Sequence, residues 1–330
     1  MDALSDHNLL GESRCFLEAI DHLIRFAKTD ATLLIEGETG TGKEIAARAA
    51  HEFSSRQGKP FIPVNCGALP ESLAESELFG SEKGAYTDAK HARNGLVTEA
   101  HNGTLFLDEV EAMPLKVQVA LLRFLQDRSF RPVGSMSVRY SDVRIIAATN
   151  MSLERLAKNS EFRSDLIFRL NVLPVQLPAL RDRGGDVILL AKVFLRRFCK
   201  QYSLPEPTLS QATESWFKRY DWPGNVRELE NIVLRGLFLC KSAVLDIPLP
   251  EGLSEVAATV QSLGSEAHFS IAKAAAIVDF ELHYLQRVLH QSGGNVTQAA
   301  MLSGTDRSAF RKLLRRHNLS AEPFRIKSQA

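Results

Sequence analysis

The stretch "GETGTGKE", residues 37–44, decides the fold of this chain. It follows the apolar run "ATLLIE" and leads into "IAARAAHEFSSR", which has the pattern of a helix. The glycines let backbone N–H groups curl around phosphate oxygens, and Lys43 can reach the terminal phosphates. A glycine turn with a surface lysine is the alternative, but the strand before the loop and the helix after it favour a phosphate-binding loop. The predicted ligands are the eight loop residues Gly37, Glu38, Thr39, Gly40, Thr41, Gly42, Lys43 and Glu44.

One position departs from the usual pattern of such loops. Glu44 stands where a serine or threonine hydroxyl would bind Mg²⁺, so the metal needs an acid from elsewhere. The run "TLFLDEV" (104–110) supplies one, because it resembles a buried strand that ends in Asp108 and Glu109. Asp108 would hold Mg²⁺, directly or through water, and Glu109 would orient or deprotonate the attacking water. By itself the run could be a strand that ends in solvent, and the phosphate loop is what favours a hydrolytic site.

Polar residues end two further strand patterns. Thr149 and Asn150 close "IIAATN" (145–150), where they could sense the γ-phosphate, although a simple strand-end cap is the alternative. Asn65 ends another apolar run, where it could reach Glu109. Ligands bind outside the carboxyl ends of the strands in open α/β sheets, so all of these residues fall at the expected edge.

Five short apolar runs predict buried strands, with helix-like stretches such as "PLKVQVALLRFLQD" between several of them. The runs are "ATLLIEG" (31–37), "FIPVNC" (61–66), "TLFLDEV" (104–110), "VRIIAATN" (143–150) and "LNVLPVQLP" (170–178). This alternation predicts an α/β fold with a mainly parallel, helix-flanked sheet. Amphipathic helices without strands follow over residues 184–240 and predict a small helical domain.

The last part of the chain divides into a linker and a second helical region. Residues 241–266 carry two prolines, two glycines and no sustained periodicity, which indicates a linker. The predicted organisation is an α/β nucleotide-binding part (1–178), a helical lid (179–240), the linker (241–266) and an all-α domain (267–330).

Composition adds limits to the function. No apolar run of about 18 residues occurs, and the N-terminus lacks the pattern of a signal peptide, so we expect a cytoplasmic protein without a membrane span. The four cysteines are scattered with no CxxC spacing, which argues against a disulfide framework or a zinc site. The net charge is only +1, but residues 305–330 carry seven basic and two acidic side chains.

That basic region has the pattern of a helix-turn-helix. The segments "NVTQAAML" and "RSAFRKLLRR" predict two short helices joined by a glycine turn, with Ala299, Ala300, Leu302, Phe310 and Leu314 on their core faces. A solvated basic surface is the alternative, but the turn favours binding to double-stranded DNA. The candidates for contacts in the major groove are Arg307, Ser308, Arg311 and Lys312, and those for phosphates are Arg315 and Arg316.

Several long motifs, in order, resemble one family. "GETGTGKE", "ESELFGSEKGAYTDA", "GTLFLDEV", "FRSDLIFRLNV", "LPALRDR" and "WPGNVRELEN" are similar to the AAA+ domain of bacterial enhancer-binding proteins, the ATPases that activate sigma-54 RNA polymerase. The resemblance covers roughly residues 8–240. The segment "GGNVTQAAMLSGTDRSAFRKLLRRHNL" resembles the Fis-type helix-turn-helix that these proteins often carry.

The resemblance implies ATP as substrate, Mg²⁺ as cofactor and an active homo-oligomer, usually a hexamer, with each nucleotide between two subunits. It assigns Arg163 and Arg169 as candidate arginine fingers that act on the neighbouring subunit, and Arg227 as the sensor arginine of the lid. It also makes Asn65 and Glu109 a switch pair.

The loop "EKGAYTDAK" (82–90) occupies the position of the family's GAFTGA loop, which contacts sigma-54. The resemblance therefore makes Tyr86 and Thr87 the contact residues, although Tyr86 could instead pack on its own domain. Tyr86 replaces the usual phenylalanine, and Asp88 replaces a glycine, which removes backbone freedom and adds a negative charge.

Three hypotheses follow. The first is a DNA-bound ATPase that activates transcription by remodelling the sigma-54 RNA polymerase holoenzyme from an upstream site. The second is a DNA-binding AAA+ regulator that no longer contacts sigma-54 because of Asp88, and the third is a DNA-binding scaffold with an inactive ATPase. The intact Lys43, Asp108 and Glu109 argue against the third. The ATPase pattern begins near residue 8, so we expect no N-terminal regulatory domain, as in the phage-shock regulator. Control would then come from a regulatory protein in trans, from the expression level or from the DNA.

Overall fold

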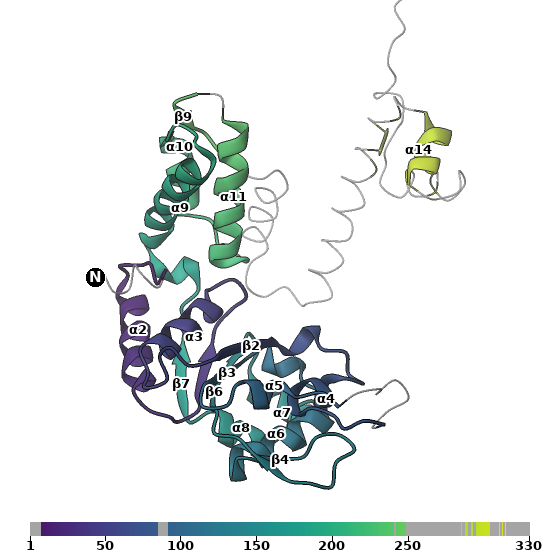
Figure 1. Cartoon of the computed structure of the whole chain (residues 1–330). Coiled ribbons are helices and arrows are strands. Elements are labelled where there is room, and N and C mark those ends of the chain that lie inside the picture. The colour runs from purple at the N-terminus through teal and green to yellow at the C-terminus, as the bar shows by residue number, and fades with distance from the viewer. Residues whose placement is uncertain are drawn as a thin grey trace, which may run out of the picture. The chain divides into compact units, whose positions relative to one another are not determined.

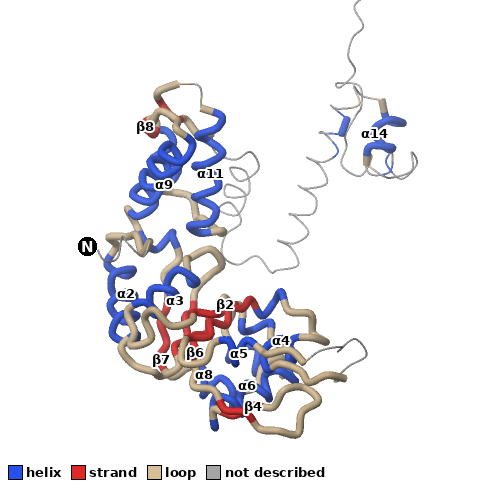
Figure 2. Tube along the Cα trace, viewed as in Figure 1, coloured by secondary structure: helices blue, strands red, loops and turns tan. Residues whose placement is uncertain are grey.

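The structure, a computed structural model, contains two compact units, Met1–Pro248 and Leu249–Ala330, and each is described here by itself. In the first unit it describes residues 8–84, 92–240 and 242–248. In the second it describes Leu285, Val288, Leu289, Ser292, residues 295–303, Phe310, Lys312 and Leu314. Figure 1 labels the elements, and Figure 2 shows the same view coloured by secondary structure.

The first unit is built on one parallel sheet. Its five strands are β1 (Leu33–Glu36), β2 (Phe61–Asn65), β3 (Thr104–Asp108), β6 (Arg144–Thr149) and β7 (Leu173–Gln176). They lie in the order β2-β3-β6-β1-β7, and every neighbouring pair is parallel. The five strands fall within the five apolar runs, so the predicted parallel α/β sheet is confirmed. The register of β2 and β3 pairs Asn65 with Asp108, which brings two predicted site residues to one edge.

Helices cover both faces of the sheet, and the strands alternate between the two cores. One core contains Phe106 and lies under α2 (Arg14–Ala27) and α3 (Lys43–Glu52). The other contains Leu105 and Leu107, which point to the opposite face because side chains alternate along a strand. The helices on that second side are α4 (Ala74–Phe79), α5 (Leu96–Glu99), α6 (Leu115–Asp127), α7 (Leu153–Lys158) and α8 (Ser164–Leu170).

Short elements connect these parts. They are the 3-10 turns η1 (Cys66–Ala68), η2 (Val110–Ala112) and η3 (Leu180–Arg183), and the strand pairs β4 (Ser129–Phe130) with β5 (Arg139–Tyr140) and β8 (Thr208–Leu209) with β9 (Val244–Leu245).

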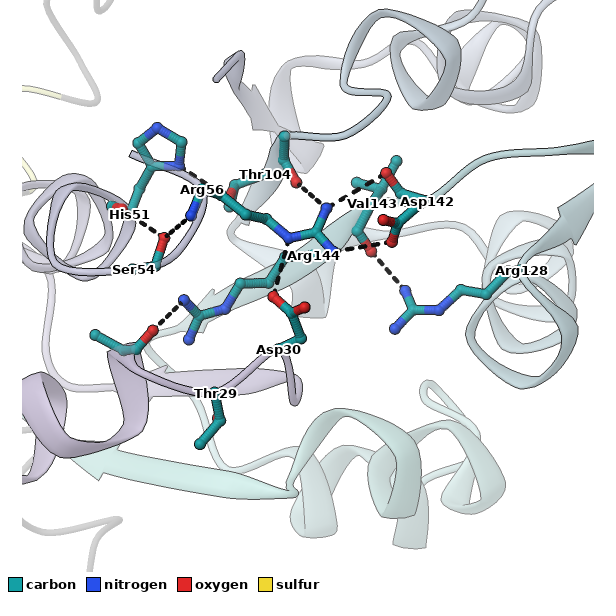
Figure 3. A network of polar contacts seen from close by, with 12 residues as sticks. Thr29, Asp30, His51, Ser54, Arg56, Thr104, Arg128, Asp142, Val143 and Arg144 are labelled. Atoms are coloured by element: carbon teal, nitrogen blue, oxygen red, sulfur yellow. Dashed lines mark hydrogen bonds and ion pairs between the residues drawn. The ribbon is translucent and has the colours of Figure 1, made fainter. Parts of the chain in front are cut away.

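A polar network joins segments beside the amino ends of β3 and β6 (Figure 3). Arg56 bridges Asp30 and Asp142, with nitrogen–oxygen distances of 2.9 Å to each carboxylate. Arg144, which is fully buried, donates to the backbone oxygens of Phe26 and Ala27 at the end of α2. These bonds satisfy carbonyl groups that have no partner within the helix itself, so they fix α2 to the sheet.

The lid follows η3 as three helices. They are α9 (Asp186–Tyr202), α10 (Gln211–Phe217) and α11 (Asn225–Leu239), which confirms the predicted helical subdomain. Asp186 forms a buried ion pair with Arg183, 2.9 Å long, and accepts hydrogen bonds from the backbone N–H groups of Glu12 and Ser13. The start of α9 is therefore bonded to the segment that precedes α2.

In the second unit, α14 (Val296–Leu302) starts at the N-cap residue Asn295, whose side chain accepts from the N–H groups of Thr297 and Gln298. Its described core comprises Leu285, Val288, Leu289, Ala299, Ala300, Phe310 and Leu314. The predicted core positions Ala299, Ala300, Phe310 and Leu314 are thus confirmed as buried. Lys312 is exposed, whereas Arg307, Ser308, Arg311, Arg315 and Arg316 lie outside the described residues.

No helix in the described part of the chain is long and apolar enough to cross a membrane.

Candidate nucleotide-binding site

A cavity of about 240 Å³ opens at the carboxyl edge of the sheet, between the phosphate loop and the lid. It is lined by Thr39, Gly40, Gly42, Lys43, Glu44, Ile45, Asp108, Glu109, Asn150, Val226, Arg227 and Glu230. The loop after β1, the end of β3, the end of β6 and the first turns of α11 thus meet around one space, as the strand-end prediction requires.

The loop conformation depends on glycine at two positions. Gly42 has φ 100°, which favours glycine, and no atom lies within 4 Å of the place where a Cβ would be. Gly40 has φ 80°, and a Cβ there would collide with the carbonyl oxygen of Gly224 in the lid. Of the eight predicted ligands, Gly37, Glu38 and Thr41 do not line the cavity.

Lys43 begins α3 and is largely buried. Its Nζ donates to the backbone oxygens of Gly37 at 2.8 Å and Glu38 at 3.1 Å. Burial lowers the pKa of Lys43, and the nearby carboxylate of Asp108 opposes that shift. The lysine therefore lies beside two carbonyls of its own loop, close to acids at the end of β3.

The predicted acid pair ends β3 in two different backbone conformations. Asp108 is the last strand residue, and burial raises the pKa of its carboxyl. Its Oδ1 accepts a hydrogen bond of 3.0 Å from the N–H of Glu109. Glu109 has φ 52°, in the left-handed region, a strained conformation for such a residue that is typical of functional sites.

Asn65 lies next to Glu109 rather than in the cavity. Its Oδ1 accepts from the N–H of Ala68 at 3.1 Å. The Oδ1 of Asn65 and the Oε2 of Glu109 lie 3.3 Å and 2.6 Å from the place where Gly67 would carry a Cβ. The two predicted switch residues therefore approach each other around the same glycine.

Asn150 and Thr149 differ in position. Asn150 lines the cavity, and its Nδ2 donates to Oγ1 of Thr39 at 3.3 Å. Thr149 is buried, and its hydroxyl donates to the backbone oxygen of Met151 at 2.9 Å. The Thr149 side chain therefore turns into its own strand-end bend and does not line the cavity.

A third acid near the phosphate loop, Glu111, was not predicted from the sequence. Glu111, in η2, accepts the N–H of Asn150 on Oε1 at 3.3 Å and lies close enough to Lys43 to influence its pKa. Its Oε2 is buried and has no hydrogen-bond partner among the described residues. The only sequence signal is its spacing of three residues after Asp108, which a strand-end pattern does not identify.

The lid contributes Arg227 and Glu230 to the cavity, one turn apart on α11. Glu230 forms an ion pair with Arg197 of α9. Arg227, Lys43 and the acids of β3 thus face one space from two subdomains.

The two candidate arginine fingers do not line this cavity. Arg163 precedes α8 and pairs with Asp165 at 2.7 Å on the surface, and Arg169, near the end of α8, is also exposed. Neither residue acts on the cavity of its own chain in this arrangement.

A second, apolar pocket of about 100 Å³ adjoins the loop at Thr41 and Gly42. Its apolar lining comes from Leu9, Leu10, Phe16, Ile45, Leu177, Leu190, Phe194 and Val226. The sequence does not predict this pocket, because its walls come from segments that are far apart in the chain.

The predicted sigma-54 contacts Tyr86 and Thr87, and also Asp88, lie outside the described residues. The chain on either side of them is held in place. Ser81 pairs with Arg93 and with Val133, and Glu82 forms an ion pair of 2.9 Å with Arg139 of β5.

A parallel sheet, a glycine-rich phosphate loop with its lysine, an acid pair at the neighbouring strand end and a helical lid together define a P-loop ATPase of the AAA+ class. The comparisons with known proteins agree. The family model "Sigma-54 interaction domain" matches residues 9–176, and "AAA+ ATPase lid domain" matches residues 181–263. The chain belongs to the sigma-54 interaction domain family, whose partner is sigma-54 RNA polymerase.

Individual relatives are regulators of transcription. The transcriptional regulatory protein GlrR of Escherichia coli (strain K12) is 42% identical over 320 residues, which are 96% of this chain and 69% of GlrR. The acetoin dehydrogenase operon transcriptional activator AcoR of Bacillus subtilis (strain 168) is 40% identical over 326 residues, 96% of this chain and 52% of AcoR. The solved structure of NtrX from Brucella abortus in complex with ATP has a TM-score of 0.69 and 32% identity, over 94% of this chain and 69% of that chain.

Proposed function

We propose that this chain hydrolyses ATP in the cavity and uses the energy to remodel sigma-54 RNA polymerase while bound to DNA. The observation that carries the proposal is the meeting of Lys43, Asp108, Glu109 and Arg227 around one space in a member of the sigma-54 interaction domain family. In this proposal the phosphates lie against the loop and Lys43, and Arg227 contacts them from the lid. The adjoining apolar pocket suits the base, because nucleobases stack on apolar surfaces.

Glu109 is the proposed general base. It accepts a proton from the water that attacks the γ-phosphorus as the bond to the ADP oxygen breaks. Asn65 is its proposed switch partner, because both side chains approach Gly67. Asn150 lies where it can orient the water or the γ-phosphate.

The donor set of the cavity fits Mg²⁺. Carboxylate oxygens are the ligands this ion prefers, and the carboxylate of Asp108 lines the cavity near Lys43. The ion would neutralise charge that develops on the phosphates, and Asp108 would hold it.

Three further parts complete the proposal. A homo-oligomer, a hexamer in the active state, brings Arg163 and Arg169 to the site of the neighbouring subunit. Tyr86 and Thr87 contact sigma-54, and residues 267–330 bind DNA upstream of a promoter as a Fis-type helix-turn-helix.

The site assignment is tested with two variants. Lys43→Ala should abolish nucleotide binding, because no other cation of the loop faces the phosphates. Glu109→Gln should keep binding and lower turnover by about 10²–10⁴-fold, the usual contribution of a general base. Binding is measured with a fluorescent nucleotide and turnover by phosphate release. Turnover at the level of the unaltered protein in either variant would contradict the assignment.

A further inference from the structure

The phosphate loop carries one carboxylate that points away from the cavity. Glu38 is the second residue of the loop but does not line the cavity. Its Oε2 lies 2.9 Å from Nη1 of Arg181 in η3, and its Oε1 contacts Nη2 of the same arginine. Oε2 also accepts a hydrogen bond of 3.1 Å from the side chain of Asn225, the first residue of α11. These bonds lower the pKa of Glu38 to about 2, so its carboxylate is charged at neutral pH.

Asn225 joins three segments of the chain through one side chain. Its Nδ2 donates to Glu38 and also to the backbone oxygen of Thr39 at 3.0 Å. Its Oδ1 accepts the N–H of Leu180 in η3 at 2.8 Å. The residue is fully buried and has φ 51°, a conformation that asparagine adopts more readily than most residues. One amide thus links the phosphate loop, the connection to the lid and the lid itself.

The backbones of the loop and the lid are also in contact. The N–H of Val226 donates to the backbone oxygen of Gly40 at 3.0 Å, and Gly40 has no room for a side chain against Gly224. The next residue, Arg227, lines the cavity. A displacement of the loop is therefore passed to the first turn of α11, which carries Arg227.

The same loop holds the lysine that faces the cavity. The Nζ of Lys43 donates to the carbonyl groups of Gly37 and Glu38. These two carbonyls take two of the three N–H donors of the ammonium group, so a phosphate that accepts more than one of them displaces a carbonyl. Glu38 is thus bonded to the phosphate-binding lysine through its carbonyl and to the lid through its carboxylate.

We propose that Glu38, Arg181 and Asn225 form a coupling triad that transmits occupation of the phosphate loop to the lid. Glu38 is a positioning residue: it sets the first turn of α11, and with it Arg227, without touching the substrate. This inference rests on the proposed nucleotide site.

The test uses the full chain and ADP as the probe. Hydrogen exchange of a peptide covering residues 222–229 is measured with and without ADP, together with ADP affinity and ATP turnover. In the unaltered chain, ADP slows exchange of this peptide. In Glu38→Ala, ADP affinity changes by less than about fivefold, because loss of an exposed ion pair alters a free energy only slightly. The response of the lid peptide is lost, and turnover falls by about fivefold or more, as expected for a coupling between sites.

Further variants separate coupling from general damage. Arg181→Met leaves the phosphate loop intact and should reproduce the result of Glu38→Ala, and the double variant should lose no more than Glu38→Ala alone. Glu38→Gln keeps an acceptor for Asn225 and should restore part of the response. Glu18→Ala is the matched control, because it removes an exposed ion pair of 2.7 Å within α2 and should change nothing.

The outcomes are distinct. A lid peptide that responds to ADP equally in Glu38→Ala and in the unaltered chain overturns the triad while the nucleotide site stands. Strong loss of ADP affinity in both Glu38→Ala and Arg181→Met also overturns it, because the residues would then act in binding. Failure of the unaltered chain to bind ADP contradicts the proposed nucleotide site itself.

Discussion

At the residue scale, Asp108 lies in surroundings that oppose its charge. Burial raises the pKa of its carboxyl, and the N–H of Glu109 and the ammonium group of Lys43 offset the shift only in part. When folding raises the pKa of a carboxyl group, the folded state is most favoured at a pH below the unfolded pKa, which is about 3.9 for aspartate. That contribution is lost as the pH rises through the folded pKa, so at neutral pH the charge of Asp108 destabilises the fold.

Asp108→Asn should therefore make the protein more stable at pH 7 while it abolishes turnover. The gain should shrink as the pH falls and vanish near pH 3, where Asp108 is protonated in both states. Thermal unfolding between pH 3 and pH 8 measures it. A variant that is less stable than the unaltered protein at pH 7 would contradict the assigned environment of this carboxylate.

Asp30→Asn is the matched control with the opposite sign. The hydrogen bond from Arg56 lowers the pKa of Asp30, so its contribution is present above the unfolded pKa and is lost as the pH falls through the folded pKa. This variant should be less stable than the unaltered protein at pH 7, and the difference should disappear in acid.

Residue types and spacing could predict the loop, Lys43 and the acid pair, because each follows from a local pattern. The direction of a side chain at a strand end could not be predicted. Thr149 and Asn150 are neighbours in the sequence, yet only Asn150 lines the cavity. Glu111 was missed because it lies in the turn η2, and nothing local indicates that this turn folds back beside Lys43.

At the element scale, Arg163 at the N-cap of α8 and Arg169 within α8 both lie outside the cavity of their own chain. If they act on a neighbouring subunit, ATPase activity per subunit should rise steeply with protein concentration. A mixture of Arg163→Ala and Lys43→Ala subunits should recover activity that neither has alone, because one supplies the binding site and the other the arginine. Linear dependence on concentration without recovery would indicate a self-contained site.

The loop between Gly84 and Ala92 gives a second prediction at this scale. Its flanks are paired through Ser81, Arg93 and Val133, which ties them to the segment between β4 and β5. Thr87→Ala should lose transcription activation but keep ATPase activity and DNA binding. The measurement is in vitro transcription with sigma-54 polymerase, together with capture of sigma-54 by the protein bound to a transition-state analogue of ATP.

Asp88→Gly is the companion variant and should keep activation, because it restores the residue usual at that position in the family. If Thr87→Ala leaves transcription unchanged and no analogue captures sigma-54, the loop does not contact sigma-54. The chain would then be a DNA-binding regulator of another kind.

Element prediction succeeded where the signal was local and failed where it was not. All five strands of the sheet lie within predicted apolar runs. The three inner strands β3, β6 and β1 are buried along almost their whole length, and a strand buried on both faces is apolar throughout. The apolar pocket could not be predicted, because Leu9 and Phe16 line it together with Leu190 and Phe194 of the lid, which are far away in the sequence. The periodicity of apolar residues identifies the buried face of a helix or strand, but not which of these faces pack against each other.

At the scale of the whole molecule, the two compact units should separate in function. Removal of residues 267–330 should leave ATPase activity and abolish specific DNA binding, because the phosphate loop, acids and lid all lie before residue 249. Phosphate release and a binding titration with cognate and random DNA measure the two effects. Loss of ATPase activity in the shortened chain would show that the units depend on each other.

Strand order also has a consequence for synthesis of the protein. β1 leads into the phosphate loop, and its neighbours in the described sheet are β6 and β7. Leu33 therefore has no strand partner until Ile146 of β6 and Leu173 of β7 have been synthesised. At about 5–20 residues per second, the ribosome needs roughly 7–28 s after it makes β1 to complete β7. During that interval the apolar segment "LLIE" has no strand partner, and transiently unpaired apolar strands promote aggregation. Nascent chains should therefore acquire nucleotide binding late, only once the polypeptide beyond residue 176 has left the exit tunnel.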